Sequence, residues 1–419
     1  MTGAAVAVAV SFLAAVLLWR EPRLDGDQGR PLPAGVARVL GSSWFRRVLA
    51  GLGLLAAAWT GVALLFGADS ARNPVPWVVY VLLWVGLVPL SVLFGPVWRL
   101  LNPLRTVHAL LNRALGLDPA DGVRPLPPRL GYWPGAAGLL AFTWLELVAP
   151  DNADLTTLRF AIGLYVTVQL LAALVFGSGW FERGDAFEVW SGLFGRMSVL
   201  GRREDGVLVL RRPTVGLAAL PGPGGAAGLV ATVAVMLGST AYDGIAGSSS
   251  WTAWAQEQPV SQTLLGTLGL LGSVAAVGAL YVVCAGAAGV AAGTGWRGMP
   301  TAFAHSLVPV ALGYVVAHYW SLFVLEGQRA VARLSDPLAN GSDLLGTGSW
   351  TPSTALVEPT LVACVMVAAV VGGHVVGVLL AHDRAVRLFP RRAAAVGQVP
   401  LMVLMVTLTC LGLFLLFSD

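Results

Sequence analysis

The chain has 419 residues, of which 56% are hydrophobic and only 11% are charged. This composition excludes an ordinary soluble domain, because a water-exposed surface of that size needs many more charges. The net charge of +4 comes from 26 basic residues, all of them arginine, against 22 carboxylates. We expect a polytopic membrane protein whose arginines face lipid headgroups, with the lipid bilayer and no nucleic acid as its partner.

Long apolar runs follow one another along the chain and predict about ten membrane-spanning helices in a single membrane domain, residues 1–419. Most runs are long enough to cross about 30 Å of hydrocarbon at about 1.5 Å per residue. The predicted spans are 2–19, 48–67, 76–95, 134–149, 160–179, 226–245, 262–292, 301–325, 357–381 and 398–417. The expected fold class is all-α, an integral membrane helical bundle. The first span lacks a basic leading segment and a cleavage site, so we expect it to remain as an anchor.

The arginines alternate between the connecting segments. Arg-rich segments hold 22 of them, and the other segments hold only Arg72, Arg159, Arg329 and Arg333. Because arginine is enriched in cytoplasmic loops, the Arg-rich segments are predicted to be cytoplasmic and both termini to lie outside the cell membrane. The outer segments then carry four arginines against 11 carboxylates. An acidic outer face favours a cation or a cationic substrate.

Two predicted cytoplasmic segments share a pattern. Phe94-Gly-Pro-Val-Trp98 ends one span and Phe176-Gly-Ser-Gly-Trp180 ends another. Each is followed by a helix start, Asn102-Pro103 as N-cap and first residue, and Asp185-Ala-Phe-Glu188 with the spacing of a capping box. We predict two amphipathic helices that lie in the cytoplasmic headgroup plane. The alternative is an internally duplicated helix pair, as many transporters have.

Ionisable residues inside membrane spans are costly and therefore indicate function. Glu146, Asp243 and Glu326 lie at the outer ends of three predicted spans that all run from inside to outside. His318 lies about 12 Å deeper than Glu326 at helical rise. Carboxylates and an imidazole at this depth have the composition of a divalent-metal site or a general-base pair. Asp151 follows Glu146 closely and could support either.

Four histidines lie on two neighbouring predicted spans, His305 and His318 on one, and His374 and His382 on the other. His305 and His374 are expected at similar depth, where they could pair or bind a cofactor. Two imidazoles on facing helices are also the ligands of a haem, which is the alternative cofactor to a metal ion. His382 precedes Asp383 at the cytoplasmic surface, where a His–Asp hydrogen bond is expected. A structural hydrogen bond between helices is the simplest role for any one of these histidines.

The remaining signals are weaker. Cys284, Cys364 and Cys410 lie in apolar runs and are expected to be core residues. Aromatic residues such as Tyr314 and Tyr319 are expected in the interface belt or in packing. The outer segment 326–359 is predicted to be a solvated connector, with a lid over the outer site as the alternative. The chain contains no metalloprotease, Cys-x-x-Cys, serine-hydrolase or phosphate-binding motif.

Several strings resemble those of a family of actinobacterial membrane proteins described as fenitrothion hydrolase-like. They are Leu83-Trp-Val-Gly-Leu-Val-Pro89, Gly95-Pro-Val-Trp98, Leu101-Asn-Pro-Leu-Arg105, Leu130-Gly-Tyr-Trp-Pro134, Trp144-Leu-Glu-Leu-Val-Ala-Pro-Asp151, Asp185-Ala-Phe-Glu-Val189, Gly238-Ser-Thr-Ala-Tyr-Asp243, Leu312-Gly-Tyr314, Ala317-His-Tyr319, Gly373-His-Val375 and Ala381-His-Asp-Arg384. The resemblance covers nearly the whole chain after the first span. It implies hydrolysis of an organophosphate triester, which suits a metal-activated water, but it assigns no catalytic residue.

Three hypotheses follow for the function. The first is a metal-dependent hydrolase with His318, Glu146 and Asp243 as ligands or general base, supported by Glu326 and Asp151. The second is a transporter of a cation or small solute, which the repeated pattern and the acidic outer face favour. The third is a haem-binding or non-catalytic subunit of a larger complex, in which other membrane proteins or further copies of the chain are partners.

Overall fold

The computed structural model describes residues 2–24, 29–203, 205–220, 222, 225 and 227–417. Within them, eight helical segments are long and apolar enough to cross a membrane. These are α3 (Ser43–Phe66), η1 with α4 (Trp77–Val85 and Leu87–Phe94), α8 (Leu155–Phe176), α12 (Leu229–Gly247), α14 (Gln262–Ala291), α15 with η4 and α16 (Met299–Phe303, Ala304–Leu307 and Val308–Arg333), α17 (Pro359–Leu388), and α18 with α19 (Ala394–Gly397 and Val399–Phe417). The chain is a multi-pass helical membrane protein.

Two of the ten predicted spans form shorter helices. α1 (Thr2–Leu18) has 17 residues and α7 (Trp133–Leu147) has 15. At about 1.5 Å per residue, α7 extends only about 22 Å, which is less than the thickness of the hydrocarbon layer. The count of long spans is therefore eight, and the apolar runs at 2–19 and 134–149 add two helices that are too short to meet the same criterion.

The remaining elements are short and connect the spans. They are α2 (Ala34–Gly41), α5 (Trp98–Leu101), α6 (Pro103–Ala114), η2 (Pro128–Leu130), η3 (Ser178–Trp180), α9 (Phe181–Gly184), α10 (Ala186–Gly195), α11 (Val215–Ala218), α13 (Ser249–Gln256), and the strands β1 (Arg30–Pro31), β2 (Leu200–Arg202) and β3 (Leu208–Leu210). The strands pair antiparallel in the order β1-β3-β2. This small sheet is an addition to the predicted all-α fold.

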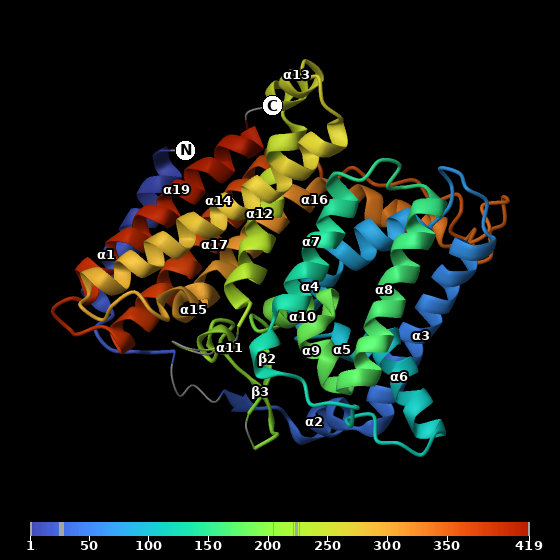
Figure 1. Ribbon diagram of the computed structural model, residues 1–419, viewed down its shortest axis with the longest axis horizontal. Helices are drawn as coiled ribbons and strands as arrows, with labels where there is room; N and C mark the ends of the chain where they lie inside the picture. The colour runs from blue at the N-terminus through green and yellow to red at the C-terminus, as the bar shows by residue number, and fades with distance from the viewer. Residues whose placement is uncertain are drawn as a thin grey trace.

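The long helices form two groups, with α16 between them (Figure 1). One group contains α1, α12, α14, α17 and α19, and the other contains α3, η1, α4, α7 and α8. α16 packs against η1 of one group and α17 of the other, while α12 packs against α7. Residues from both groups thus meet along α16, which is where the candidate site lies.

α16 and α17 approach each other closely because glycines line their contact. A Cβ built on Gly373 would lie 3.2 Å from the Cα of Gly313 and would clash with the carbonyl oxygen of Pro309. One built on Gly377 would lie 2.7 Å from the carbonyl oxygen of Ser306. Small residues allow such backbone contact between membrane helices, where dispersion takes the place of the hydrophobic effect.

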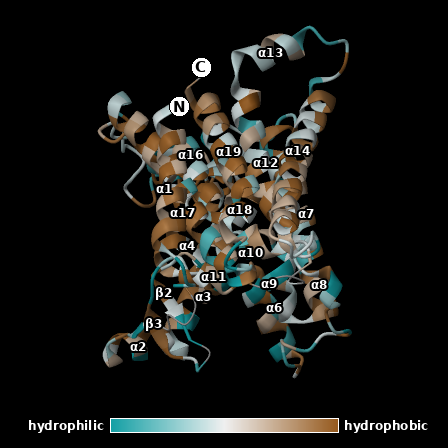
Figure 2. Ribbon diagram, turned by 90° about the vertical axis from the view of Figure 1, so that its left-hand side faces the viewer, coloured by the Kyte–Doolittle hydropathy of each residue, from teal (hydrophilic) through white to brown (hydrophobic). Residues whose placement is uncertain are grey.

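The two ends of the bundle match the predicted alternation of the connecting segments. The sheet joins two Arg-rich segments at one end, and α13, the start of α1 and the end of α19 lie at the other (Figures 1 and 2). At the α13 end, the Ala68 N–H donates to the Leu338 carbonyl at 3.0 Å, which joins two Arg-poor segments. Hydrophobic residues fill the band between the two ends (Figure 2).

Helix starts follow the predicted capping residues. The side chain of Asn102 accepts hydrogen bonds from the backbone N–H groups of Leu104 and Arg105, with Pro103 as the first residue of α6. Asp185 caps α10 by accepting from the Glu188 N–H at 2.8 Å. Both predicted caps are confirmed, since each satisfies backbone donors that the first turn leaves free.

The prediction of two helices in the headgroup plane is wrong for one of them. α6 is amphipathic, with His108 and Asn112 buried and its other residues at least partly exposed. α10 is buried along almost its whole length, and Trp190 and Phe194 are among the largest fully buried side chains. The reason is its composition: apart from Glu188 and Ser191 it is apolar on every face, so it needs protein and not water around it.

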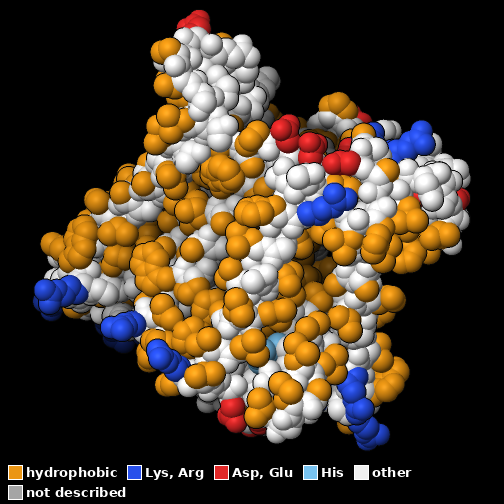
Figure 3. Space-filling model, turned by 45° about the vertical axis from the view of Figure 1, so that its right-hand side comes forward, with side chains coloured by type: hydrophobic (Ala, Val, Ile, Leu, Met, Phe, Trp, Pro, Cys, Tyr) orange, Lys and Arg blue, Asp and Glu red, His pale blue; other side chains and the backbone are white. Residues whose placement is uncertain are grey.

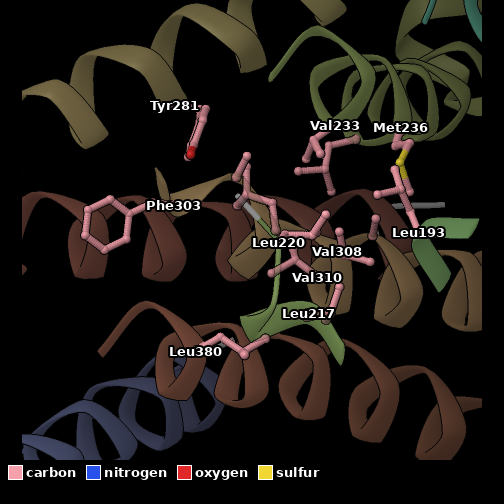
Figure 4. Close-up of a cluster of buried hydrophobic side chains, with 14 of the residues drawn as sticks. Leu193, Leu217, Leu220, Val233, Met236, Tyr281, Phe303, Val308, Val310 and Leu380 are labelled. Atoms are coloured by element: carbon pink, nitrogen blue, oxygen red, sulfur yellow. The ribbon is translucent and has the colours of Figure 1, made fainter. Parts of the chain in front are cut away.

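The core lies where α10, α11, α12, α16 and α17 converge. Leu217 and Leu220, from the segment before α12, point among Val308, Val310 and Leu193 (Figure 4). The Arg384 guanidinium holds this segment by donating to the carbonyls of Ala218 and Leu220. A connecting segment thus enters the bundle between its two groups of helices.

Candidate functional site

The candidate site is a cluster of polar side chains at the α13 end of the bundle. His318 and Tyr319 of α16 both contact Asp243 of α12: the His318 Nε2 lies 2.8 Å from Asp243 Oδ2, and the Tyr319 Oη donates to the same oxygen at 2.8 Å. Asp243 and His318 keep 20% and 24% of their side-chain surface accessible. Sequence reasoning placed Asp243 and His318 near one another, and the structure brings them into contact.

Glu146 of α7 lies within electrostatic reach of Asp243 and Tyr319. Its Oε2 atom is buried and finds no hydrogen-bond partner among the described residues. The end of α7 is fixed by Asn152, whose Nδ2 donates to the Glu146 carbonyl at 2.6 Å, while the Tyr80 Oη donates to the Asn152 carbonyl. A buried carboxylate oxygen without a donor is costly, so this is the most informative group in the cluster.

The other predicted members of the site lie elsewhere. Glu326 accepts a hydrogen bond from the Trp77 Nε1 at 2.8 Å and pairs with Arg329. Asp151 lies in the turn after α7 with a φ of 50°. In the described part of the chain no hydrogen bond or ion pair joins Glu326 or Asp151 to His318, so nothing supports their predicted supporting roles.

The donor set does not fit a resident metal ion. Among the residues that the structure describes, no three His, Cys, Asp or Glu side chains are grouped so that they could hold one. Asp243 and His318 are bonded to each other, and Glu326 is paired with an arginine. The five residues predicted as ligands thus do not form a coordination shell, which for zinc needs at least three protein ligands.

A haem has no room between the helices that carry the histidines. α16 and α17 are in backbone contact at Gly313 and Gly373, between the levels of His305 and His318. His374 Nδ1 contacts the Val370 carbonyl of its own helix at 2.8 Å, and His305 Nδ1 has no partner within the described part of the chain. The expected His305–His374 pair is therefore not a hydrogen bond.

His382 and Asp383 bind the start of the chain and not each other. His382 contacts the Gln398 Oε1 at 2.9 Å and the Trp19 carbonyl at 2.8 Å. Asp383 Oδ1 accepts from the Trp19 Nε1 and from the backbone N–H groups of Arg23 and Leu24. These two residues are structural, because they fix the segment after α1 to α17.

Aromatic side chains separate the outer cluster from the opposite end. The rings of Trp84 and Trp190 stack with centroids 4.2 Å apart, and Phe142 packs against Trp84 at 4.8 Å. Trp84 belongs to η1, a π-helix whose Trp77 and Tyr80 also contact the outer-end network. π-helices are frequent at functional sites. Sequence analysis missed this layer and assigned Tyr319 to packing; the tyrosine's position next to His318 was the one available signal.

A second polar cluster lies beyond this aromatic layer. The Arg105 guanidinium binds Glu188 through two nitrogens, with its Nε 3.1 Å from Oε2, and the Asn102 Nδ2 donates to Asp185 Oδ2 at 3.0 Å. Asp185 and Glu188 are only 1% and 4% exposed, and Tyr165 lies against Asp185. One of the two buried carboxylates thus pairs with an arginine, and the other accepts from an amide.

Asp185 is expected to make stability depend on pH. Burial raises its pKa from 3.8 to about 6; the Glu188 charge adds to this rise, while the Glu188 backbone N–H opposes it. The pKa of Asp185 is higher in the folded protein than in the unfolded chain. Its contribution to the free energy of unfolding is therefore complete below pH 4 and is lost as the pH rises through 6, a change of about 3 kcal/mol. Thermal unfolding from pH 4 to 7.5 should show this slope in the wild type and lose it in Asp185→Asn. An unchanged slope in the variant would rule out Asp185 as its source.

The long outer segment is held in place by its own hydrogen bonds. Asp336 accepts from Gly341 N–H and Ser342 Oγ, and the Trp320 Nε1 donates to the Leu356 carbonyl. These contacts favour a connector over a lid.

A pocket of about 440 Å³ opens between α7, α12, α13 and α14 and is lined by Tyr242 and Trp251 among others. Glu146 and Asp243 do not line it.

The surface charge follows the same division. On the face shown in Figure 3, acidic side chains gather at the upper end, and most of the arginines lie along the lower edge.

Comparisons with family models, with characterised proteins and with solved structures found no match for this chain.

Proposed function

We propose that this multi-pass membrane protein is a carrier that moves a cation across the membrane, with Glu146 and Asp243 as its outer binding groups. The observation that supports this most is Glu146, a carboxylate beside a second carboxylate, whose buried Oε2 has no hydrogen-bond partner among the described residues. A negative charge in an apolar bundle needs a proton or another cation to offset it. A proton is the simplest cargo.

The arrangement of polar groups supports a path. One cluster lies at the acidic end and a second lies at the Arg-rich end, and the Trp84–Trp190 stack lies between them. Two sites separated by a packed layer are what a carrier with alternating access needs. An ion channel would need a continuous wet pore.

Flux into vesicles tests the proposal. Purified protein is reconstituted with a trapped pH-sensitive dye, and a potassium diffusion potential set by valinomycin drives proton entry; radioactive sodium uptake is measured in parallel. We expect proton or sodium entry above that of protein-free vesicles, and saturation as the cation concentration rises. If neither cation enters faster than in protein-free vesicles, the proposal is wrong.

The orientation is part of the same proposal. From the arginine distribution we infer that the sheet and α6 face the cytoplasm and that both chain ends lie outside. A fluorescent protein that folds only in the cytoplasm should stay dark when fused after Phe417, and bright when inserted after Gly116 in the α6 segment. The reverse pattern would invert the path, so that Glu146 would face the cytoplasm.

Hydrolysis is the second candidate, because the Asp243–His318 pair has the geometry of a general base. Asp243 occupies Nε2, so the other ring nitrogen would take a proton from water as its oxygen attacks phosphorus and the alkoxide or phenoxide leaves. The resemblance to fenitrothion hydrolase-like proteins points the same way. Phosphotriester turnover that falls in His318→Gln would support this candidate; turnover no faster than in buffer would exclude it.

A further inference from the structure

Residues 77–114 and 155–195 are two copies of one structural unit. Each begins with a spanning helix, η1 with α4 or α8, which ends at a glycine with positive φ: 90° at Gly95 and 74° at Gly177. A four-residue helix follows, α5 or α9, and then a capped helix, α6 or α10. Trp98 and Trp180 are 82 positions apart, and the caps Asn102 and Asp185 are 83 apart because of one inserted residue.

The two copies exchange their last helices. α10 packs against α4 of the other copy, and α6 packs against α8. Individual contacts repeat in the same exchanged way. Ser91 Oγ lies 2.8 Å from Ser191 Oγ, and the equivalent residues, Ala173 and His108, lie on α8 and α6, which pack against each other.

An aromatic contact follows the same rule. The rings of Trp98 and Phe187 lie 6.1 Å apart, centroid to centroid. Their equivalents are Trp180 and Leu104, and Leu104 packs against the cluster that contains Trp180. Exchanged contacts of this kind are the mark of a twofold relation, in which residue i of one copy meets residue j of the other and j meets i.

Two contacts join equivalent positions directly, so they lie on the pseudo-twofold axis. These are Asn102 with Asp185, and Arg105 with Glu188. Because both spanning helices run in the same direction, the axis runs along the bundle. Asn102, Asp185 and Glu188 are buried there beneath the aromatic layer of Trp84 and Trp190, and Arg105 keeps 18% of its side chain exposed.

We propose that the Arg105–Glu188 and Asn102–Asp185 contacts form the inner gate of the cation path, and that the gate opens when the two copies move apart about their shared axis. This inference rests on the proposed carrier function. A contact on a symmetry axis couples both copies at once, so its rupture releases both exchanged helices. α10 then carries Trp190 away from Trp84, which opens the layer below Glu146.

The charged groups around the gate favour a contact that can both form and break. Asp185 and Glu188 of α10 face Arg105 and Asn102 of α6 and Tyr165 of α8. Burial lowers the pKa of His108, and the Arg105 charge lowers it further, so this neighbour adds no positive charge near neutral pH. Arg105 thus holds Glu188, Asn102 binds both carboxylates, and a cation arriving from outside can take the place of Arg105.

Accessibility of an introduced thiol tests the gate without any cargo. Cys284, Cys364 and Cys410 are replaced by serine, and Ser191→Cys places a thiol at a buried position on α10. A charged, membrane-impermeant thiol reagent is added from the Arg-rich side in inside-out vesicles. With Arg105→Gln the reaction should be faster by about tenfold or more, since removing one partner of a buried ion pair destabilises the closed arrangement.

Two further variants make the result specific. The exchanged pair, Arg105→Glu with Glu188→Arg, should restore slow labelling. Arg99→Gln, which removes the exposed pair with Glu182, should leave the rate unchanged. Elution as a single species on size exclusion shows that each variant is folded, and Glu188→Gln replaces Arg105→Gln if that variant is not.

The outcomes separate this inference from the function itself. Equal labelling rates in Arg105→Gln and wild type, or an equal increase in Arg99→Gln, would overturn the gate. Absence of flux in vesicles together with the predicted change in labelling would overturn the carrier while leaving the moving gate intact.

Discussion

Glu146→Gln is expected to reduce cation flux to the level of protein-free vesicles, a loss of about 100-fold or more if flux depends on this charge. The substitution keeps the size of the side chain and removes its charge. Because the Glu146 Oε2 is buried without a partner, the amide loses no ion pair within the described residues and the fold should persist. Flux is measured per folded protein, after size exclusion confirms equal incorporation.

Glu326→Gln is the matched control for Glu146→Gln. Glu326 is a second carboxylate at the same end, but it is paired with Arg329 and Trp77. Its neutralisation should leave flux within about twofold of wild type, since an exposed pair contributes about 1 kcal/mol or less. Equal loss in both variants would show that the acidic face as a whole, and not Glu146, supports flux.

The second large effect is expected at the contact of α16 with α17. Gly373→Ala should lower the free energy of unfolding by about 3 kcal/mol, because a Cβ there meets backbone atoms of α16 that cannot move aside. The neighbouring Gly372 has open space around it, so Gly372→Ala should be neutral or stabilise by up to about 1 kcal/mol through helix propensity. Thermal unfolding in detergent compares the two variants. A destabilisation by Gly372→Ala as large as that by Gly373→Ala would mean that the close contact is not the cause.

Local signals in the sequence predicted most of the helices. Apolar runs located every long span, and the caps at Asn102 and Asp185 located the starts of α6 and α10. The environment of α10 was not predictable in the same way, because a short apolar helix after a span is typical both of the membrane surface and of a buried core. Its burial and its packing against α4 and α7 distinguish the two.

The candidate site was predicted in part. The site hypothesis grouped Asp243 with His318, and the two are in contact, although helical rise had put Asp243 level with Glu326 and His318 about 12 Å deeper. Depth does not fix the direction in which a side chain points around its helix, and for this reason Glu326 was included although it faces Trp77. The roles of Tyr319 and Trp190 were not predicted, because an aromatic residue by itself does not distinguish a binding role from packing, and the position of Tyr319 next to His318 was the one available signal.

The duplicated unit shows what a repeated string can and cannot establish. The strings ending at Trp98 and Trp180 showed that two segments are alike, which left both surface helices and a true duplication open. The exchanged contact of Ser91 with Ser191, together with the packing of α6 against α8, favours duplication, because independent surface helices have no reason to swap partners.

Modification by a hydrophobic carbodiimide tests most directly whether Glu146 is the buried carboxyl group of the path. Such reagents react with protonated carboxyl groups in apolar surroundings, and peptide mass spectrometry identifies the residue. The account predicts modification at Glu146, loss of flux in proportion to it, and protection by the transported cation. Flux that persists after complete modification of Glu146, or no modification at Glu146 while flux is inhibited, would contradict it.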